Sequence, residues 1–219
     1  MTPVAVAVPG LGLTERGWRD VARHLAGTAV VALPAYGLPA GPGPIAPASS
    51  ADDLVRRLDG LADGPVVLLG HSASCQVVAE AARRHPAAVR GSVLVGPTAD
   101  PRMSPRPALV IRWLRTAARE DPRRVPAMLR DYLTTRLSGF ARALRAARRH
   151  DLRETLAGSD LPVLVVRGPH DHLAPSAWID DLAAVRPGIT VVTTRAGAHM
   201  VPLTRPEELA RVCRVALAG

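Results

Sequence analysis

A serine stands among small residues between an apolar run and a helical pattern, in the segment Gly70-His71-Ser72-Ala73-Ser74. Where a strand enters a helix through a sharp turn, a serine at the turn is exposed, and the residues two positions away must be small. Gly70 and Ser74 meet that requirement. In this context the segment predicts a nucleophilic Ser72, whereas the same pattern elsewhere would indicate an ordinary helix N-terminus.

A serine hydroxyl is a weak nucleophile that needs a base, and the base needs an acid to hold it in one tautomer. Asp171 follows an apolar run that ends near Val166, and His199 follows another that ends near Thr193. The chain order Ser, Asp, His is one of the orders in which such triads occur. We therefore expect Ser72 to be the nucleophile, Asp171 the acid and His199 the base.

Other candidate sites are weaker. Asp100 follows the fourth apolar run and is an alternative acid. A dinucleotide-binding fingerprint after the first run is incomplete, because Glu15 occupies the position of its third glycine. His170 and His172 flank Asp171, but further ligands at metal-binding spacing are missing, so we expect exposed loop histidines. The sequence predicts neither a cofactor nor a metal.

Six short apolar runs alternate with segments whose apolar residues recur three and four positions apart. Continuous apolar runs are typical of strands buried on both faces of a parallel sheet. Strands are predicted at Val4–Val8, Thr28–Leu33, Pro65–Leu69, Ser92–Val95, Pro162–Val166 and Ile189–Thr193, and helices at Thr14–Ala26, Ser50–Leu61, Ala73–Arg84, Ser176–Val185 and Pro206–Leu217. Residues 34–48, rich in proline and glycine, are predicted to form a mobile surface loop. The order predicts an α/β fold with a doubly wound, mostly parallel sheet.

The alternation is interrupted between residues 98 and 159. This segment is too long for a crossover loop, and its apolar residues recur at helical spacing around Trp113, Leu129 and Phe140. We expect two or three helices inserted into the sheet domain after its fourth strand. The chain would then consist of a core of residues 1–97 and 160–219 and a helical insertion of residues 98–159.

With these motifs the chain resembles the α/β-hydrolase superfamily over essentially its whole length. The turn at Ser72, the segment Gly168–Pro175 and the segment around His199 are similar to that family's three catalytic loops. Serine stands at position 74, where the family usually has glycine. The resemblance implies the α/β-hydrolase fold in a short form that lacks the first two strands. It also implies that residues 98–159 form the family's cap, or lid.

The resemblance further implies an oxyanion hole, in which backbone N–H groups stabilise the negative charge of a tetrahedral intermediate. Its donors would be the N–H groups of Leu11 and Ala73. This chain has Pro9-Gly10 where the family usually has His-Gly, a change that backbone donors tolerate. Gly10 and Trp113 are also expected to line the substrate pocket.

The net charge of +9 is concentrated in the insertion. Residues 101–154 hold 14 of the 28 arginines against five acids, whereas the rest of the chain is neutral. One interpretation is an exposed subdomain coated with arginine. The other is a surface for an anionic partner, such as a coenzyme A or acyl-carrier thioester or a phospholipid surface. The motifs of nucleic-acid-binding domains are missing, so we expect no nucleic-acid partner.

Two residue types are missing from the chain, which contains no lysine and no asparagine. This composition is typical of a GC-rich, bacterial source, and it excludes Schiff-base chemistry, a phosphate-loop lysine and a Cys-His-Asn triad. Cys75 and Cys213 fall in helical patterns and are expected to be small buried hydrophobic residues. Without a signal-peptide pattern or an apolar run of transmembrane length, the expected location is the cytoplasm, with no transmembrane segment.

The sequence therefore predicts a serine hydrolase that cleaves a small-molecule ester or thioester through an acyl-Ser72 intermediate, without a cofactor. The alternative is a non-hydrolytic enzyme that uses the same triad for a lyase, cyclase or synthase step on a polyketide- or CoA-like intermediate. A third hypothesis, from a different class, is a binding module that keeps the pocket without catalysis.

Overall fold

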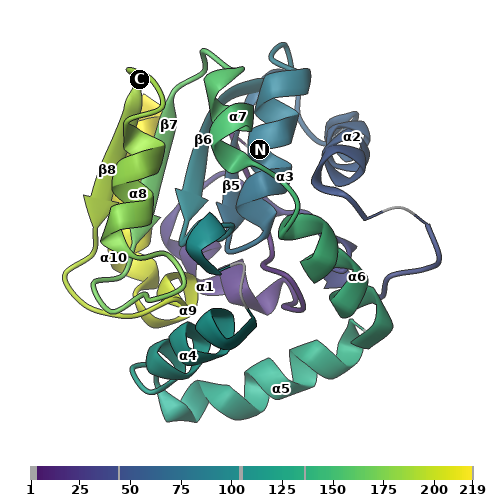
Figure 1. Ribbon diagram of the computed structural model, residues 1–219. Coiled ribbons are helices and arrows are strands. Elements are labelled where there is room, and N and C mark those ends of the chain that lie inside the picture. Colours follow the sequence, from purple (N-terminus) through teal and green to yellow (C-terminus); the bar gives the residue numbers. More distant parts are fainter. Residues whose placement is uncertain (1–3, 44, 104–105, 136, 219) are drawn as a thin grey trace.

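The chain folds around a six-stranded parallel sheet (Figure 1). The computed structural model describes residues 4–43, 45–103, 106–135 and 137–218. The strands lie in the order β2-β1-β5-β6-β7-β8, and each neighbouring pair is parallel. They are β1 (Ala5–Val8), β2 (Thr28–Val30), β5 (Val66–His71), β6 (Val89–Val95), β7 (Val163–Arg167) and β8 (Ile189–Thr193). The six predicted strands are all present, and the α/β fold class is confirmed.

The order of the strands reverses between β1 and β5. The chain first adds β2 on one side of β1 and then crosses back to place β5 on the other side. Such a reversal leaves a crevice at the carboxyl ends of the strands, where ligands bind in open α/β sheets. Val8 lies opposite Gly70 in the register, so the loop after β1 and the turn after β5 meet in this crevice.

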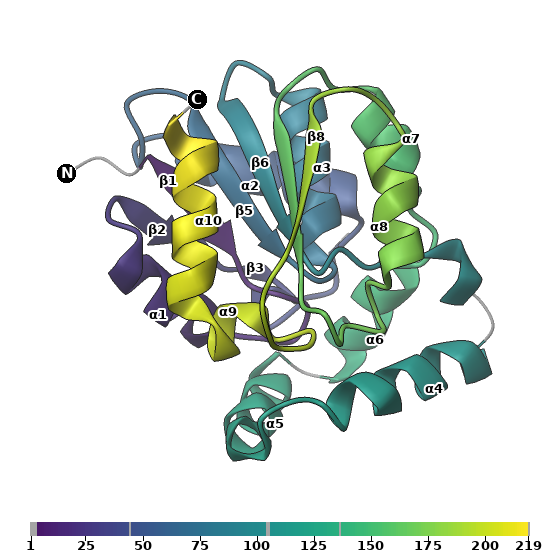
Figure 2. The same cartoon turned by 90° about the vertical axis from the view of Figure 1, so that its left-hand side faces the viewer.

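Helices cover both faces of the sheet (Figures 1 and 2). Successive side chains of a strand point to opposite faces, so Val6 and Val8 join one hydrophobic cluster while Ala5 and Ala7 join another. The first cluster includes side chains of α2 (Pro47–Leu58), α3 (Ser74–Arg84), α7 (Leu152–Ala157) and α8 (Ser176–Ala183), and the second those of α1 (Arg16–His24), α9 (Val201–Thr204) and α10 (Pro206–Ala218). Burial on both faces explains why the inner strands β1, β5, β6 and β7 are continuous apolar runs, whereas the edge strands β2 and β8 are partly exposed.

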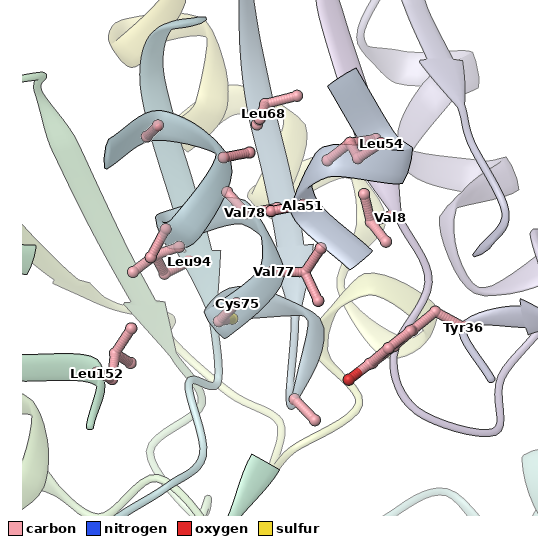
Figure 3. Close-up of a cluster of buried hydrophobic side chains, with 14 of the residues drawn as sticks. Val8, Tyr36, Ala51, Leu54, Leu68, Cys75, Val77, Val78, Leu94 and Leu152 are labelled. Atoms are coloured by element: carbon pink, nitrogen blue, oxygen red, sulfur yellow. The ribbon is translucent and has the colours of Figure 1, made fainter. Parts of the chain in front are cut away.

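Figure 3 shows part of the first cluster, where Val78 of α3 and Leu54 of α2 lie beside Leu68 of β5. Cys75 belongs to this cluster and Cys213 to the cluster on the other face, both as free thiols. The expectation that both cysteines are small buried hydrophobic residues is confirmed.

The described residues of the segment 34–48 are only partly the surface loop that the sequence predicts, since residues 41–43 are exposed but others are buried. Ala35 and Tyr36 are fully buried in the first cluster, and Figure 3 shows Tyr36 there. At this point β3 (Leu33–Pro34) pairs with β4 (Gly37–Leu38). Proline and glycine indicate turns, but they carry no signal for the burial of the residues between those turns. The prediction of turns in this segment is therefore sound, whereas the prediction of an exposed loop is wrong for the buried residues between those turns.

Among the described residues, four α-helices and two short 3-10 helices lie between β6 and β7, where the sequence predicts two or three helices. Three of the α-helices, α4 (Arg106–Ala117), α5 (Val125–Thr134) and α6 (Leu137–Ala147), pass beyond the carboxyl ends of the strands, as the predicted insertion requires (Figures 1 and 2). The fourth, α7, returns to pack against α3. The division into a core and a cap at residues 98 and 159 stays a prediction. Within the described ranges, each helix is too short or too polar to cross a membrane.

The packing of α7 predicts a difference between two leucine substitutions. Leu152 of α7 is fully buried, whereas Leu133 of α5 is 75% exposed. Leu152→Ala is expected to lower the free energy of unfolding by about 2–5 kcal/mol, because it leaves a cavity in the first cluster. Leu133→Ala is expected to change it by less than about 0.5 kcal/mol. Chemical denaturation measures both, and equal losses would contradict this packing.

Candidate active site

Ser72 lies in a strained turn between β5 and α3. Its φ is +58°, in the left-handed region that costs a residue with a side chain roughly 1–2 kcal/mol. The turn stays attached to the sheet, because the N–H of Ser72 donates to the carbonyl of Val95 at 2.9 Å. A strand, a left-handed serine and a helix thus follow one another without a gap, as the sequence predicts.

The small residues on either side of Ser72 are required for different reasons. A Cβ atom at Gly70 would lie 2.8 Å from the Cα of Cys75, so a side chain does not fit there. Ser74 is fully buried, and its Oγ accepts a hydrogen bond from the N–H of His71 at 2.8 Å. The same Oγ lies 3.0 Å from the carbonyl oxygen of Val8 in β1. Serine therefore joins the turn to the neighbouring strand, which glycine could not do.

The structure brings the three predicted catalytic residues together. Ser72 Oγ lies 2.9 Å from His199 Nε2, and His199 Nδ1 lies 2.8 Å from Asp171 Oδ2. Ser72 follows β5, Asp171 follows β7 and His199 follows β8. The carboxyl ends of these strands lie at one edge of the parallel sheet. This arrangement is the hydrogen-bond geometry of a nucleophile, a base and an orienting acid.

Asp171 is buried and hydrogen-bonded through both oxygens. Its Oδ1 accepts the N–H groups of Leu173 and Ala174 at 2.9 and 3.0 Å. Burial raises the pKa of Asp171, but the charge and hydrogen bond of His199 and these two N–H groups lower the pKa below its ordinary value. Asp171 is therefore a carboxylate, which keeps a proton on Nδ1 of His199 and turns Nε2 toward Ser72.

His199 is also buried. Burial lowers the pKa of His199, but the charge of Asp171, the hydrogen bond to Asp171 and the charge of Glu120 outweigh burial and raise the pKa. The imidazolium is thus stabilised, as a base that takes a proton requires. A Cβ atom at Gly96 would lie 3.0 Å from Asp171 Oδ2 and 3.1 Å from His199 Nδ1, so glycine leaves room for this pair.

His71 contacts the loop of His199. Its Nε2 lies 3.0 Å from the carbonyl oxygen of His199, and because a carbonyl can only accept, Nε2 carries a proton. Burial lowers the pKa of His71 to about 3, so the ring is neutral. His71 is therefore a turn residue that packs and hydrogen-bonds.

Gly10 does not have the predicted place in the pocket. A Cβ atom at Gly10 would lie 2.7 Å from Nδ1 of His71, so the imidazole covers this glycine. Gly10 is not among the residues that line the cavity beside Ser72, and its expected pocket role is wrong. The sequence could not show this, because the covering ring comes from a strand about 60 residues further along the chain.

A cavity of about 980 Å³ adjoins Ser72 and His199. Trp113 lines it, as the sequence predicts, although 51% of this residue's surface is exposed. The helices between β6 and β7 supply most of its apolar wall, through Leu109, Val110, Trp113, Met128, Leu129, Tyr132, Phe140 and Leu144. The cavity therefore suits an apolar group placed next to a reactive serine.

Leu11 and Ala73 also line this cavity. Neither backbone N–H donates to a protein acceptor among the hydrogen bonds of the described residues. The loop around Leu11 is fixed, because the N–H of Gly12 donates to the carbonyl of Ala35 at 2.9 Å. An oxyanion hole requires two N–H groups aimed at one point beside the nucleophile, and these two residues both lie in the lining next to Ser72.

The other candidates from the sequence do not reach this arrangement. Asp100 is buried, but its carboxylate accepts hydrogen bonds from Arg102 at 2.8 Å and Arg112 at 2.6 Å, so Asp100 as the acid is wrong. His170 is exposed, as expected, whereas His172 is half-buried and its N–H donates to Thr116 Oγ1 at 3.1 Å. Across the described part of the chain, no three His, Cys, Asp or Glu side chains are placed to hold a metal ion.

Glu120, which follows α4, is a further residue at the site that the sequence does not predict. Its Oε1 accepts the N–H groups of His199 at 2.7 Å and Met200 at 2.8 Å. Its Oε2 is buried, with no hydrogen-bond partner among the described residues, and burial raises the pKa of this carboxyl group. In the sequence Glu120 stands between Arg119 and Asp121, a pattern typical of a solvated surface, so no local signal distinguishes it.

Comparison with known proteins agrees with the fold. A family model described as "Alpha/beta hydrolase family" matches residues 5–212. A solved structure from work on carboxylesterases of Nitrososphaera gargenis has a TM-score of 0.80 at 18% identity and covers 99% of this chain and 90% of its own. The enol-lactonase of Burkholderia xenovorans LB400 has a TM-score of 0.79 at 19% identity, with coverage of 100% and 92%.

Among curated proteins, polyketide synthase ThaQ of Burkholderia thailandensis is 28% identical over 235 residues. The match covers 94% of this chain but 11% of ThaQ, so the chain spans about a tenth of the length of that relative.

The crowded turn at Ser72 predicts that Gly70→Ala is strongly destabilising. The added methyl group would overlap the backbone at Cys75, and overpacking of this kind costs about 1–3 kcal/mol of the free energy of unfolding. Gly17→Ala in α1 is the control, because a Cβ atom there meets nothing within 4 Å. Denaturation curves of both variants measure the difference, and a Gly70→Ala protein as stable as wild type would refute the described turn.

Proposed function

The chain belongs to the alpha/beta hydrolase family, and we propose that it is a serine hydrolase that cleaves an ester or thioester through an acyl-Ser72 intermediate. The observation that carries this proposal is the unbroken hydrogen-bond chain from Ser72 Oγ through His199 to the buried carboxylate of Asp171. That chain activates a hydroxyl group that is otherwise a weak nucleophile.

In the first half of the reaction, Ser72 Oγ attacks the carbonyl carbon of the substrate while its proton moves to Nε2 of His199. The tetrahedral intermediate then collapses, the bond to the leaving alcohol or thiol breaks, and the imidazolium of His199 gives its proton to the leaving group. In the second half, a water molecule loses a proton to Nε2 and attacks the acyl carbon. The proton then returns to Ser72 Oγ, and the carboxylic acid leaves.

The negative charge of the intermediate falls on the former carbonyl oxygen. We assign its stabilisation to the N–H groups of Leu11 and Ala73, which line the cavity beside Ser72 without protein acceptors among the described residues. Removing one such donor from a serine hydrolase typically costs a factor of about 10²–10³ in kcat. Backbone donors would explain why Pro9 is tolerated before Gly10, since side chains take no part.

The cavity supports an acyl group with a substantial apolar part. Its volume of about 980 Å³ lies at the upper end of the range of small-molecule sites, and α4, α5 and α6 supply apolar side chains around it. We place these helices in a cap of residues 98–159 that covers a core of residues 1–97 and 160–219. Burial of the acyl chain beneath this cap would hold the carbonyl group next to Ser72.

The charge of the cap supports a substrate that is linked to an anionic carrier or to coenzyme A. Arg145 of α6 and Arg149, which follows it, are exposed, and Arg149 also lines the cavity. Positive charge near the cavity would attract a phosphorylated or acidic leaving group and raise its local concentration.

One observation favours a second candidate, a non-hydrolytic step with the same triad. The curated relative ThaQ is a polyketide synthase, and it matches nearly the whole of this chain. An acyl-Ser72 intermediate could then transfer its acyl group to a hydroxyl within the chain or to another acceptor instead of to water. Product analysis in isotopically labelled water distinguishes the candidates, because only hydrolysis places solvent oxygen in the product.

Substitution of the nucleophile tests the mechanism. Ser72→Ala is expected to abolish turnover of an activated ester while it leaves the thermal unfolding midpoint close to that of wild type. A fluorophosphonate probe should label wild type and not the variant. Labelling that survives in Ser72→Ala would assign the reactive group to another residue and overturn the proposal.

Salt dependence tests the role of the cap's charge. The kcat/KM for a coenzyme A or carrier-linked thioester should fall severalfold between about 0.05 and 0.5 M salt, because screening lengths drop well below 10 Å. A short neutral ester should show a flat profile.

Arg149→Gln should raise KM for the anionic substrate by about two- to fivefold, as loss of an exposed charge pair allows. Arg211→Gln, which changes an exposed arginine of α10, is the matched control. Identical salt profiles for both substrates would contradict the anionic carrier.

A further inference from the structure

One face of α4 contacts the loops that follow neighbouring strands of the sheet. Residues four apart lie above one another on a helix, and Arg112 and Thr116 have this spacing. Arg112 donates to Asp100, in the loop after β6, at 2.6 Å. Thr116 is buried, and its Oγ1 accepts the N–H of His172, in the loop after β7, at 3.1 Å. The second contact lies one residue from the expected catalytic acid.

Glu120 continues this series four residues further along, in the turn that ends α4. Its Oε1 accepts the N–H groups of His199 and Met200 in the loop after β8, at 2.7 and 2.8 Å. A single stretch of the cap therefore contacts the loop of the acid and the loop of the base. Hydrogen bonds to a carboxylate are roughly twice as strong as hydrogen bonds between neutral groups. The bonds of Glu120 to the His199 loop should therefore be stronger than the bond of Thr116 to His172.

We propose that Thr116 and Glu120 are positioning residues through which the cap holds the loops of Asp171 and His199 in their reactive arrangement. The inference rests on the proposed function of this triad. It differs from the usual view of a cap as a cover, because removal of the α4 contacts would disturb the catalytic base itself rather than access to it.

The peptide groups of His199 are fixed from two sides. Glu120 binds its N–H, and Nε2 of His71 donates to its carbonyl oxygen at 3.0 Å. The first bond comes from the cap and the second from the end of β5. The imidazole must meet Ser72 Oγ and Asp171 Oδ2 at the same time, and a misplacement of about 1 Å can cost a factor of 10² in rate. Backbone bonds on both sides limit such a misplacement.

The charge of Glu120 also acts on the base. Asp171, Glu120 and His71 are the titratable groups that face His199. Both carboxylates raise the pKa of His199, whereas His71 is neutral because burial lowers its pKa to about 3. Removal of the Glu120 charge should therefore lower the pKa of His199, and the rate, which needs a neutral base, should reach its plateau at a lower pH.

Four substitutions distinguish the effect of the hydrogen bonds from the effect of the Glu120 charge and from a general effect on the stability of the fold. Glu120→Gln keeps a carbonyl oxygen for both N–H groups and puts its amide nitrogen where Oε2 has no partner, so it removes the charge alone. Glu120→Ala removes the charge and both bonds. Thr116→Val removes one acceptor at nearly constant shape. Asp121→Asn is the matched control, because Asp121 accepts the N–H of Arg123, which asparagine can also do. Among the described residues, no hydrogen bond joins Asp121 to the catalytic loops.

For Glu120→Gln we expect a kcat within about threefold of wild type and a pH profile of kcat/KM whose rising limb lies at lower pH. For Glu120→Ala we expect the same direction of shift and a kcat lower by about 10- to 100-fold, with a smaller change in KM. Thr116→Val should lose about two- to tenfold in kcat. Asp121→Asn should match wild type both in kcat and in the pH profile of kcat/KM.

Titration of His199 by NMR of histidine-labelled protein provides the same test without substrate. A lower midpoint in Glu120→Ala than in Glu120→Gln supports the proposal even if no substrate is turned over, because a displaced imidazole loses part of its bond to Asp171 beyond the loss of the Glu120 charge. Failure of the proposed function is therefore distinguishable from failure of this inference. Equal His199 midpoints in Glu120→Ala and Glu120→Gln would overturn it. So would a Glu120→Ala protein that unfolds at a lower temperature but retains wild-type kcat and pH profile, because Glu120 would then serve stability alone.

Discussion

The left-handed turn at Ser72 is the constraint on which the rest of the site depends. It joins a fully buried strand directly to a buried helix, so the serine leaves the sheet at its carboxyl edge with its hydroxyl beside the cavity. The strain of the turn, of order 1–3 kcal/mol, is tolerated because the packing of β5 and α3 fixes the chain on both sides. Crowding within the turn leaves no space for a side chain at Gly70, and it places the hydroxyl of Ser74 against β1.

Once Ser72 is placed, the main physical difficulty of the site is the burial of charge. Asp171 and His199 are both shielded from water, and an isolated buried carboxylate would be protonated rather than charged. The loop after β7 solves this with two backbone N–H groups on one oxygen of Asp171, while the imidazole occupies the other. The pKa of Asp171 is lowered and that of His199 is raised. The imidazolium therefore stabilises the negative charge of the carboxylate, and the carboxylate stabilises the positive charge of the imidazolium.

The helices between β6 and β7 combine two different surfaces. Their inner side chains, such as Leu109 and Tyr132, surround an apolar cavity, while exposed arginines such as Arg145 lie outside. The same segment also reaches the sheet through polar contacts, among them the buried Asp100 with Arg112. The geometry of the base therefore depends on a part of the chain that the periodicity of the sequence identifies only as an inserted group of helices.

The sequence by itself determined the sheet, the turn at Ser72 and the order of the triad, because these depend on local patterns: buried apolar runs, small residues at a tight turn, and polar residues directly after strands. It did not determine the burial of Tyr36, the covering of Gly10 by His71 or the contact of Glu120 with His199. Each of these joins segments that are distant in the chain, and local composition carries no signal for such contacts. Only the tertiary structure decided them, since they arise when the strand order and the path of the cap bring separate loops to one edge of the sheet.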